Sequence, residues 1–135
     1  MAEAFHLRII SPASVVVDAY VPSVQIPGVE GDFGVLPGHS NVFSMIRPGV
    51  IDVKMPDGIH RRFFAVSGYA DVTPDSCTVI SDHIQDLADI SPAEADEAVS
   101  SARSALAGAE TADARAAAEK LLHSSETLAA AVRAA

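Results

Sequence analysis

The sequence changes character near residue 90. All seven aromatic residues lie at or before Tyr69, and all eight prolines lie at or before Pro92. Seven of the eight glycines lie at or before Gly68, whereas the chain beyond position 92 is rich in alanine with scattered charges. Aromatic residues with frequent turn formers favour short strands, and alanine is the strongest helix former. We therefore expect a β part followed by a shorter helical part.

The first ninety residues follow the pattern of short strands between turn signals. Phe5, Leu7 and Ile9 alternate with polar residues, and the triplets 56–58 and 74–76 contain proline, aspartate and glycine or serine. No helical period of 10–15 residues interrupts the series, which argues against a parallel βαβ sheet. The pattern predicts antiparallel strands at residues 5–9, 15–17, 21–26, 35–36, 42–46, 50–55, 59–66, 69–72 and 77–81, with a polar connector at 82–89.

The helical part has a clear start and two helices. Ser91 is placed as an N-cap, Pro92 occupies the first helical position and Glu94 completes a capping box. Gly108 is expected to end the first helix, and Thr111 to cap the second. The short connection makes the helices antiparallel neighbours. The fold class is thus mainly β plus α: an antiparallel β-sandwich domain at 1–88 and a two-helix hairpin at 89–135.

The apolar faces predicted for these helices are thin, because alanine buries little area. The first face consists of Ala95, Val99, Ala102 and Leu106, and the second of Ala114, Ala118, Leu121, Leu128 and Val132, with Ser125 interrupting it.

The charge distribution excludes several partners. The formal charge is −9, with −6 on residues 1–90 and −3 on 91–135. Neither part has the clustered cations that bind nucleic acid or anionic lipid. Cys77 is the single cysteine, so a reducing compartment is expected. The longest uncharged stretch, residues 33–46, is too short and too broken by Pro37 and Gly38 to span a bilayer, and no signal peptide is recognisable.

No motif for catalysis, metal or cofactor binding is present in the sequence. Gly28, Gly31 and Gly34 match neither a dinucleotide fingerprint nor a phosphate loop, and predict a tight turn instead. The five histidines lack metal-ligand spacing, and no serine lies in a nucleophile elbow. These residues leave three readings open: a structural subunit, a free-standing β-sandwich binding module, or a small enzyme of unrecognised type.

One long motif favours the first reading. Residues 26–41 read IPGVEGDFGVLPGHSN. This stretch resembles the signature of the epsilon subunit of rotary ATP synthases, which is called delta in mitochondria. Flanking segments at 5–11, 46–49 and 66–69 match as well, and the family shares the layout of a β-sandwich followed by a helical hairpin.

The resemblance implies a non-catalytic central-stalk subunit of a proton-translocating ATP synthase, which couples rotation of the c ring to ATP synthesis. By this resemblance Glu30, Gly31 and Asp32 face the c ring, where a basic residue would meet the two carboxylates. Ser11 and His39 match positions that face the gamma subunit. From the residues alone, Glu30 and Asp32 are better explained as solvated turn residues. The implied location is the cytoplasmic face of the bacterial inner membrane, reached only through the complex.

The resemblance also bears on regulation. In the family the hairpin contacts the alpha and beta subunits and opposes ATP hydrolysis, and some members bind ATP through a motif that opens the first helix. Here Ser91 replaces the Asp of that motif and Glu94 replaces its Arg. An anion in place of a cation repels phosphate, so no ATP binding is expected. The second helix is also poor in cations, which predicts weak or absent braking.

Overall fold

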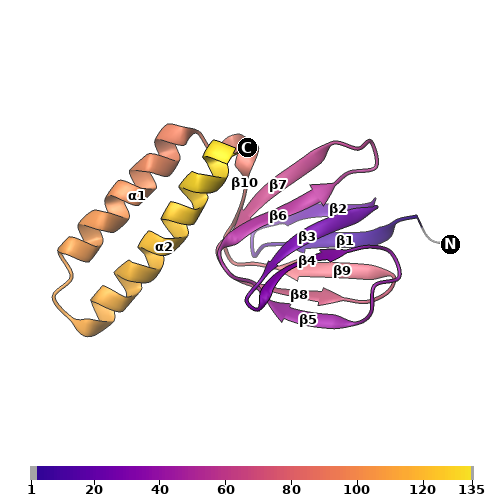
Figure 1. The fold of residues 1–135 in the computed structure, drawn as a ribbon, viewed down its shortest axis with the longest axis horizontal. Coiled ribbons are helices and arrows are strands. Elements are labelled where there is room, and N and C mark those ends of the chain that lie inside the picture. The colour runs from indigo at the N-terminus through magenta and orange to yellow at the C-terminus, as the bar shows by residue number, and fades with distance from the viewer. Residues whose placement is uncertain (1–2, 135) are drawn as a thin grey trace. The chain divides into compact units, whose positions relative to one another are not determined.

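The computed structural model describes residues 3–134, which form two compact units, one ending at Asp86 and the other beginning at Leu87 (Figure 1). The first unit contains two five-stranded sheets, in the orders β2-β1-β9-β8-β5 and β10-β7-β6-β3-β4. We call them the first and the second sheet. The strands are β1 (Phe5–Ile10), β2 (Val15–Val21), β3 (Ser23–Gly28), β4 (Gly31–Val35), β5 (Val42–Met45), β6 (Gly49–Lys54), β7 (His60–Ala65), β8 (Tyr69–Val72), β9 (Ser76–Ile80) and β10 (Ile84–Asp86).

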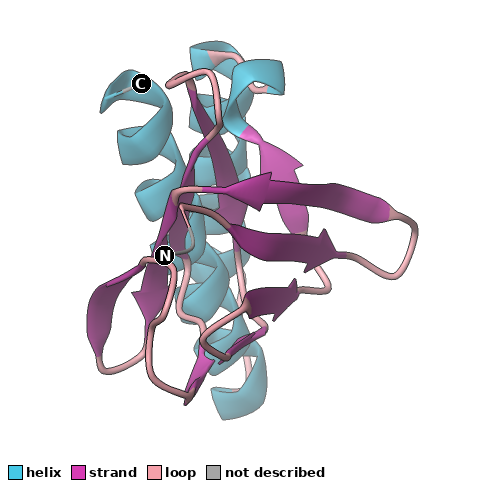
Figure 2. Cartoon of the chain, turned by 90° about the vertical axis from the view of Figure 1, so that its right-hand side faces the viewer, coloured by secondary structure: helices cyan, strands magenta, loops and turns pink. Residues whose placement is uncertain are grey.

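The sandwich core is built by strand alternation. In β1, Phe5, Leu7 and Ile9 are buried while the residues between them lie toward the other face of the first sheet. Ile51 and Phe63 contribute from the second sheet and are fully buried. These inward residues form one apolar cluster between the two sheets, as the expected β-sandwich requires. Figure 2 shows the strands of the two sheets in magenta.

One strand pairing differs from the expected antiparallel arrangement. β1 pairs antiparallel with β2 on one side but parallel with β9 on the other, with Leu7 opposite Cys77. All other strand pairs of the two sheets are antiparallel among the described residues. Alternation and turn signals act over short distances along the chain, so they do not report a pairing between segments about seventy residues apart.

Several predicted strand boundaries are wrong; the strand expected at 35–36, for example, is β4 at Gly31–Val35. The strand expected at 21–26 is divided, because β2 ends at Val21 and β3 begins at Ser23, with Pro22 between them. Proline lacks the amide donor that a continuous ladder needs. The segment expected as a polar connector contains β10, in which Ile84 pairs with Ala65, and a 3-10 helix at Leu87–Asp89.

The second unit is the expected pair of helices, α1 (Pro92–Ala107) and α2 (Ala112–Ala134). The hydroxyl of Ser91 accepts a hydrogen bond from the Glu94 amide at 3.1 Å, which confirms the N-cap. Gly108 ends α1, and its N–H donates to the Ser104 carbonyl. The hydroxyl of Thr111 accepts from the Ala114 amide at 3.0 Å and caps α2 as predicted.

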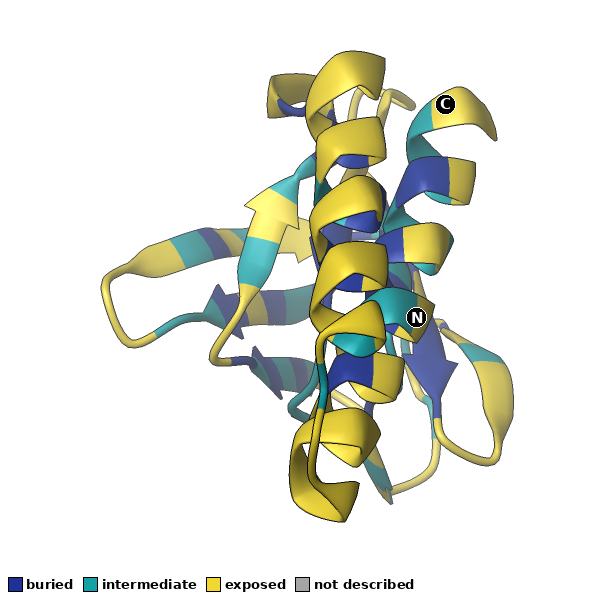
Figure 3. Cartoon of the chain, turned by 90° about the vertical axis from the view of Figure 1, so that its left-hand side faces the viewer, coloured by how far each residue is buried: buried dark blue, intermediate teal, exposed yellow. Residues whose placement is uncertain are grey.

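The predicted face of α2 is partly wrong. Ala114 is exposed and Leu121 is 53% exposed, whereas Ala118, Ser125 and Ala129 are buried. Figure 3 shows buried positions in dark blue and exposed positions in yellow along the two helices. Positions 118, 125 and 129 follow the 3.6-residue period, so the buried strip runs through the serine that was expected to interrupt it. The adjacent Ser124 is also buried, and its hydroxyl donates to the Leu121 carbonyl at 3.0 Å. A hydroxyl that bonds back to its own helix tolerates burial.

Candidate docking site

The central part of the long motif forms the β3–β4 hairpin. Gly28 lies opposite Gly31, and residues 29–30 make the tight turn that the glycines predicted. Gly31 has a φ of 138°, which disfavours any residue with a side chain. A Cβ on Gly28 would lie 2.8 Å from the Gly31 carbonyl oxygen and 2.9 Å from the hydroxyl of Ser44. Gly31 therefore serves the positive φ of the turn, and Gly28 serves the close approach of neighbouring atoms.

The turn and the β3 side of this hairpin are held by residues 45–47, at the end of β5 and just after it. The Val29 amide donates to the Met45 carbonyl at 3.0 Å, and the Arg47 amide donates to the Pro27 carbonyl at 3.0 Å. Gly28 also forms an isolated bridge with Ile46. Backbone hydrogen bonds to the turn and to β3 restrict the orientation of the hairpin relative to the sandwich.

The two carboxylates of the turn have different surroundings. Asp32 accepts a hydrogen bond from the Arg47 guanidinium at 2.5 Å, and the same guanidinium lies 3.4 Å from the Gly28 carbonyl. Glu30 is exposed at the tip and has no hydrogen bond or ion pair with any residue in the range 3–134. The turn thus presents one free carboxylate and one that is already paired.

His39 lies beside this turn. A hollow of about 580 Å³ is lined by the turn, by β5 and by His39. The Nδ1 of His39 donates to the Ser40 carbonyl at 2.7 Å, so the ring is held by its own loop. Ser11 lies elsewhere, in a turn after β1 where its amide donates to the Ser14 carbonyl at 2.9 Å. The structure therefore groups His39 with Glu30, Gly31 and Asp32, and does not bring Ser11 to them.

A second surface was missed by the sequence analysis. On the outer face of the first sheet, one register line crosses all five strands and contains only apolar or aromatic side chains. We call it the outer apolar row; its members are Val15, Ile10, Ile80, Tyr69 and Met45. Val15 and Met45 are 52% and 51% exposed, and the exposed ring of Phe43 lies 5.2 Å from that of Tyr69. Finding this row requires the strand order and register, which the sequence does not provide.

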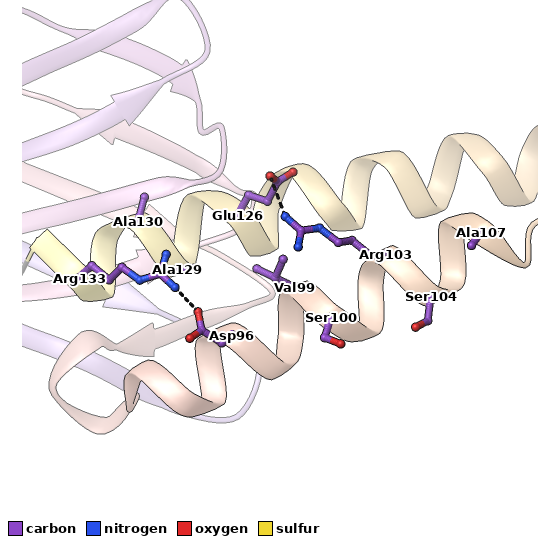
Figure 4. Close-up of a pocket in the computed structure, with 10 residues that line it drawn as sticks. All are labelled: Asp96, Val99, Ser100, Arg103, Ser104, Ala107, Glu126, Ala129, Ala130 and Arg133. Atoms are coloured by element: carbon purple, nitrogen blue, oxygen red, sulfur yellow. Dashed lines mark hydrogen bonds and ion pairs between the residues drawn. The ribbon is translucent and has the colours of Figure 1, made fainter.

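The helical hairpin carries a groove of about 610 Å³ between α1 and α2 (Figure 4). Two ion pairs cross it. Arg133 pairs with Asp96, and Arg103 lies 3.9 Å from Glu126. Both arginines that line the groove are therefore matched by carboxylates of the opposite helix. Ser91 and Glu94, the two altered positions of the family's nucleotide motif, lie at the start of α1, where the Ser91 hydroxyl donates to the Glu94 carboxylate at 3.1 Å.

The titratable groups give little support for a catalytic or metal-binding site. Burial raises the pKa of the Cys77 thiol to about 12, so it is not a thiolate at neutral pH. Residues 3–134 contain no group of three or more potential metal ligands from histidine, cysteine and acidic side chains. Neither described helix combines the length and apolar character that a bilayer crossing demands.

Comparison with known proteins agrees with this architecture. The β-sandwich domain of ATP synthase delta/epsilon chains matches residues 4–86. The ATP synthase epsilon chains of Brucella anthropi and Brucella canis are 39% and 38% identical over 128 residues, covering 95% of this chain and 95% of each relative.

Two solved structures share the fold. One is a chain of the Euglena gracilis mitochondrial ATP synthase, with a TM-score of 0.86 at 22% identity, covering 98% of this chain and 83% of that one. The other is from the central stalk and c ring of the Tetrahymena thermophila enzyme, with a TM-score of 0.69 at 9% identity, covering 95% and 96%. With the sequence match spanning nearly the whole chain, this protein belongs to the ATP synthase delta/epsilon chain family.

Proposed function

We propose that this chain is a non-catalytic central-stalk subunit that couples rotation of the c ring to ATP synthesis. The observation that carries the proposal is the clamped β3–β4 turn, a rigid projection with a free carboxylate at its tip. Its location would be the cytoplasmic face of the inner membrane, through the complex alone. A rigid antiparallel sandwich suits this task, since it transmits force between two partners without chemistry of its own.

The c ring is proposed to contact Glu30, Gly31 and Asp32. The turn is exposed, and backbone hydrogen bonds of 3.0 Å hold Val29 in the turn and Pro27 on β3. A carboxylate held in one place forms a stronger charge-assisted hydrogen bond with a cation than a mobile one, because less freedom is lost on binding.

The gamma subunit is proposed to contact the outer apolar row, together with Ser11, which follows the row member Ile10 in the chain. Five strands give the row a span of about 19 Å, as expected from strand spacing. Apolar side chains aligned across a sheet face are typical of a protein interface. Asp71 lies on the next outward-facing register line, two residues from Tyr69 along β8, is exposed, and has no ion pair with the described residues. A second copy packed face to face would bring like charges together, which favours a different chain that carries a cation.

His39 suits either interface. It lies in the hollow beside the turn, which also contains Met45 from the end of the outer apolar row. We propose that His39 faces the gamma subunit, because Met45 joins the hollow to the outer apolar row.

The gamma contact is tested by binding measurements with the purified gamma subunit and the full chain. Ile80→Lys and Val15→Lys place a cation in the row and are expected to weaken binding by about tenfold or more, since buried apolar anchors dominate interfaces. Ile59→Lys is the matched control, because Ile59 is 63% exposed but outside the row. Equal binding by all three variants would contradict this placement.

The hairpin is proposed to bind no ATP and to brake hydrolysis weakly through the alpha and beta subunits. Ser91 and Glu94 are engaged in the α1 cap, and Arg103 and Arg133 are paired across the groove. Few cationic side chains of the hairpin remain to bind the phosphates of ATP or acidic surfaces of the alpha and beta subunits. Calorimetry with ATP is expected to give no heat of binding, and a micromolar dissociation constant would contradict the proposal.

A further inference from the structure

Arg47 contacts the β3–β4 hairpin at three points. Its guanidinium donates to the Asp32 carboxylate at 2.5 Å and lies 3.4 Å from the Gly28 carbonyl oxygen. Its backbone amide donates to the Pro27 carbonyl at 3.0 Å. One residue from the segment after β5 therefore touches both strands of the hairpin just below the turn that carries Glu30.

The ion pair is not explained by stability. The side chains of Arg47 and Asp32 are 42% and 53% exposed. Exposed pairs of this kind contribute about 0–1 kcal/mol to folding. Its main effect is on charge: Arg47 neutralises the carboxylate on β4, while Glu30, two residues earlier, keeps its full negative charge.

We propose that Arg47 is a positioning residue that makes Glu30 the one effective anionic contact of the turn. The inference rests on the proposed function, in which this turn docks on a cationic side chain of the c ring. Within the proposed c-ring contact of residues 30–32, Asp32 then serves as the anchor of Arg47, and Glu30 alone meets the cationic side chain of the partner. The planar guanidinium suits this task because it reaches a carboxylate and a carbonyl at once, which an ammonium does less well.

The experiment uses ATP synthase that lacks this subunit, reconstituted into lipid vesicles. Purified full-length chain is added back, and the concentration that half-restores ATP-driven proton uptake is measured at low and high salt. The variants are Glu30→Gln, Asp32→Asn, Arg47→Ala, Arg47→Lys and the double change Arg47→Ala with Asp32→Asn. Arg62→Ala is the matched control, since Arg62 is another exposed arginine paired with an aspartate, at 3.4 Å, but on β7.

Each variant has a distinct expected result. Glu30→Gln raises the half-restoring concentration about tenfold at low salt and flattens its salt dependence, because the charged contact is lost. Asp32→Asn changes the half-restoring concentration less than about twofold, as expected for a charge that is already neutralised. Arg47→Ala exposes a second carboxylate and steepens the salt dependence. The double change returns that dependence to the wild-type slope, and Arg47→Lys resembles wild type more than Arg47→Ala does.

The outcomes distinguish a failure of the role proposed for Arg47 from a failure of the proposed function. If Asp32→Asn weakens restoration as much as Glu30→Gln, Asp32 meets the partner itself and the role of Arg47 is overturned. If wild type restores proton uptake but no turn variant differs from it, the c-ring placement fails. If wild type restores nothing, the proposed function fails. Thermal unfolding and amide exchange at Val29 in the isolated variants exclude loss of the hairpin, because the Val29 amide reports directly on the bond between the turn and Met45.

Discussion

At the scale of single residues, neighbours decide how a charged side chain behaves. His6 lies 2.5 Å from the Asp18 carboxylate and stacks on Tyr20, with ring centroids 4.9 Å apart. The hydrogen bond from His6 holds the pKa of Asp18 below its ordinary value, with a smaller Coulombic contribution from Arg8. This cluster lies on the outer face of the first sheet, so its charge is sensitive to solvent conditions.

Asp18 predicts a pH-dependent contribution to stability. A carboxyl group whose pKa is lowered by folding stabilises the fold above its unfolded pKa, about 3.9, and the contribution is lost as pH falls through the folded pKa. Asp18→Asn is therefore expected to lower the unfolding midpoint near about pH 6 and to lower it less near about pH 2. Thermal unfolding followed by circular dichroism at both pH values tests this. A gap of equal size at the two pH values would contradict it.

Gly68 predicts a large backbone effect. Its φ is 131°, and a Cβ there would lie 2.1 Å from the Ile80 carbonyl oxygen. Gly68→Ala is expected to lower the free energy of unfolding by more than about 3 kcal/mol, because strain and a backbone clash combine. Gly58→Ala is the control: φ is 85°, but no atom lies within 4 Å of the added Cβ, so strain alone acts. Denaturant unfolding compares them, and equal losses would show that the clash is relieved.

At the scale of elements, the caps were predictable and the faces were not. Ser91, Gly108 and Thr111 act through groups within four residues along the chain, so their roles follow from local sequence. The buried strip of α2 was mispredicted because alanine and serine carry almost no hydrophobic signal. Leu121 looked like a core residue by type alone, yet it is 53% exposed.

Ser91→Ala tests the N-cap of α1. The change removes the acceptor of the Glu94 amide and is expected to cost about 1 kcal/mol of helix stability. Ser101→Ala is the control, since Ser101 is exposed within α1 and alanine is the better helix former. Amide exchange in the first turn of α1 is the measurement. Equal exchange in the two variants would show that the cap contributes nothing.

The candidate site likewise has features that the sequence predicts and features that it does not. The turn at 28–32 was predictable, because three glycines and a family motif mark it. The pairing of Asp32 with Arg47 was not, since fifteen residues separate the two and neither belongs to a charge motif. The outer apolar row was also missed, because its five members come from five strands and meet only through the register.

At the scale of the whole molecule, the two units have separate interiors. The sandwich buries large side chains such as Phe5, Phe63 and Leu7, whereas the hairpin buries mainly alanine and serine. Burial of large apolar side chains provides most of the stability of a small domain. The sandwich is therefore expected to hold its fold without the helices.

Deletion of residues 90–135 tests this expectation and the proposed weak braking together. The shortened chain is expected to unfold cooperatively, with a midpoint close to that of the sandwich in the full chain. In the assembled enzyme, the deletion is expected to leave the ATP hydrolysis rate nearly unchanged. Loss of cooperative unfolding would contradict the first expectation, and a large rise in hydrolysis would contradict the second.

The parallel pairing of β1 with β9 has a consequence for biosynthesis. β1 emerges first from the ribosome, but its partner at Ser76–Ile80 emerges only after most of the sandwich has been made. Until then, Phe5, Leu7 and Ile9 have only β2 beside them. Pairings with such long sequence separation form slowly and leave apolar strands open to aggregation. The nascent chain is therefore most dependent on chaperones during this interval, and a pause in translation before codon 76 would prolong it.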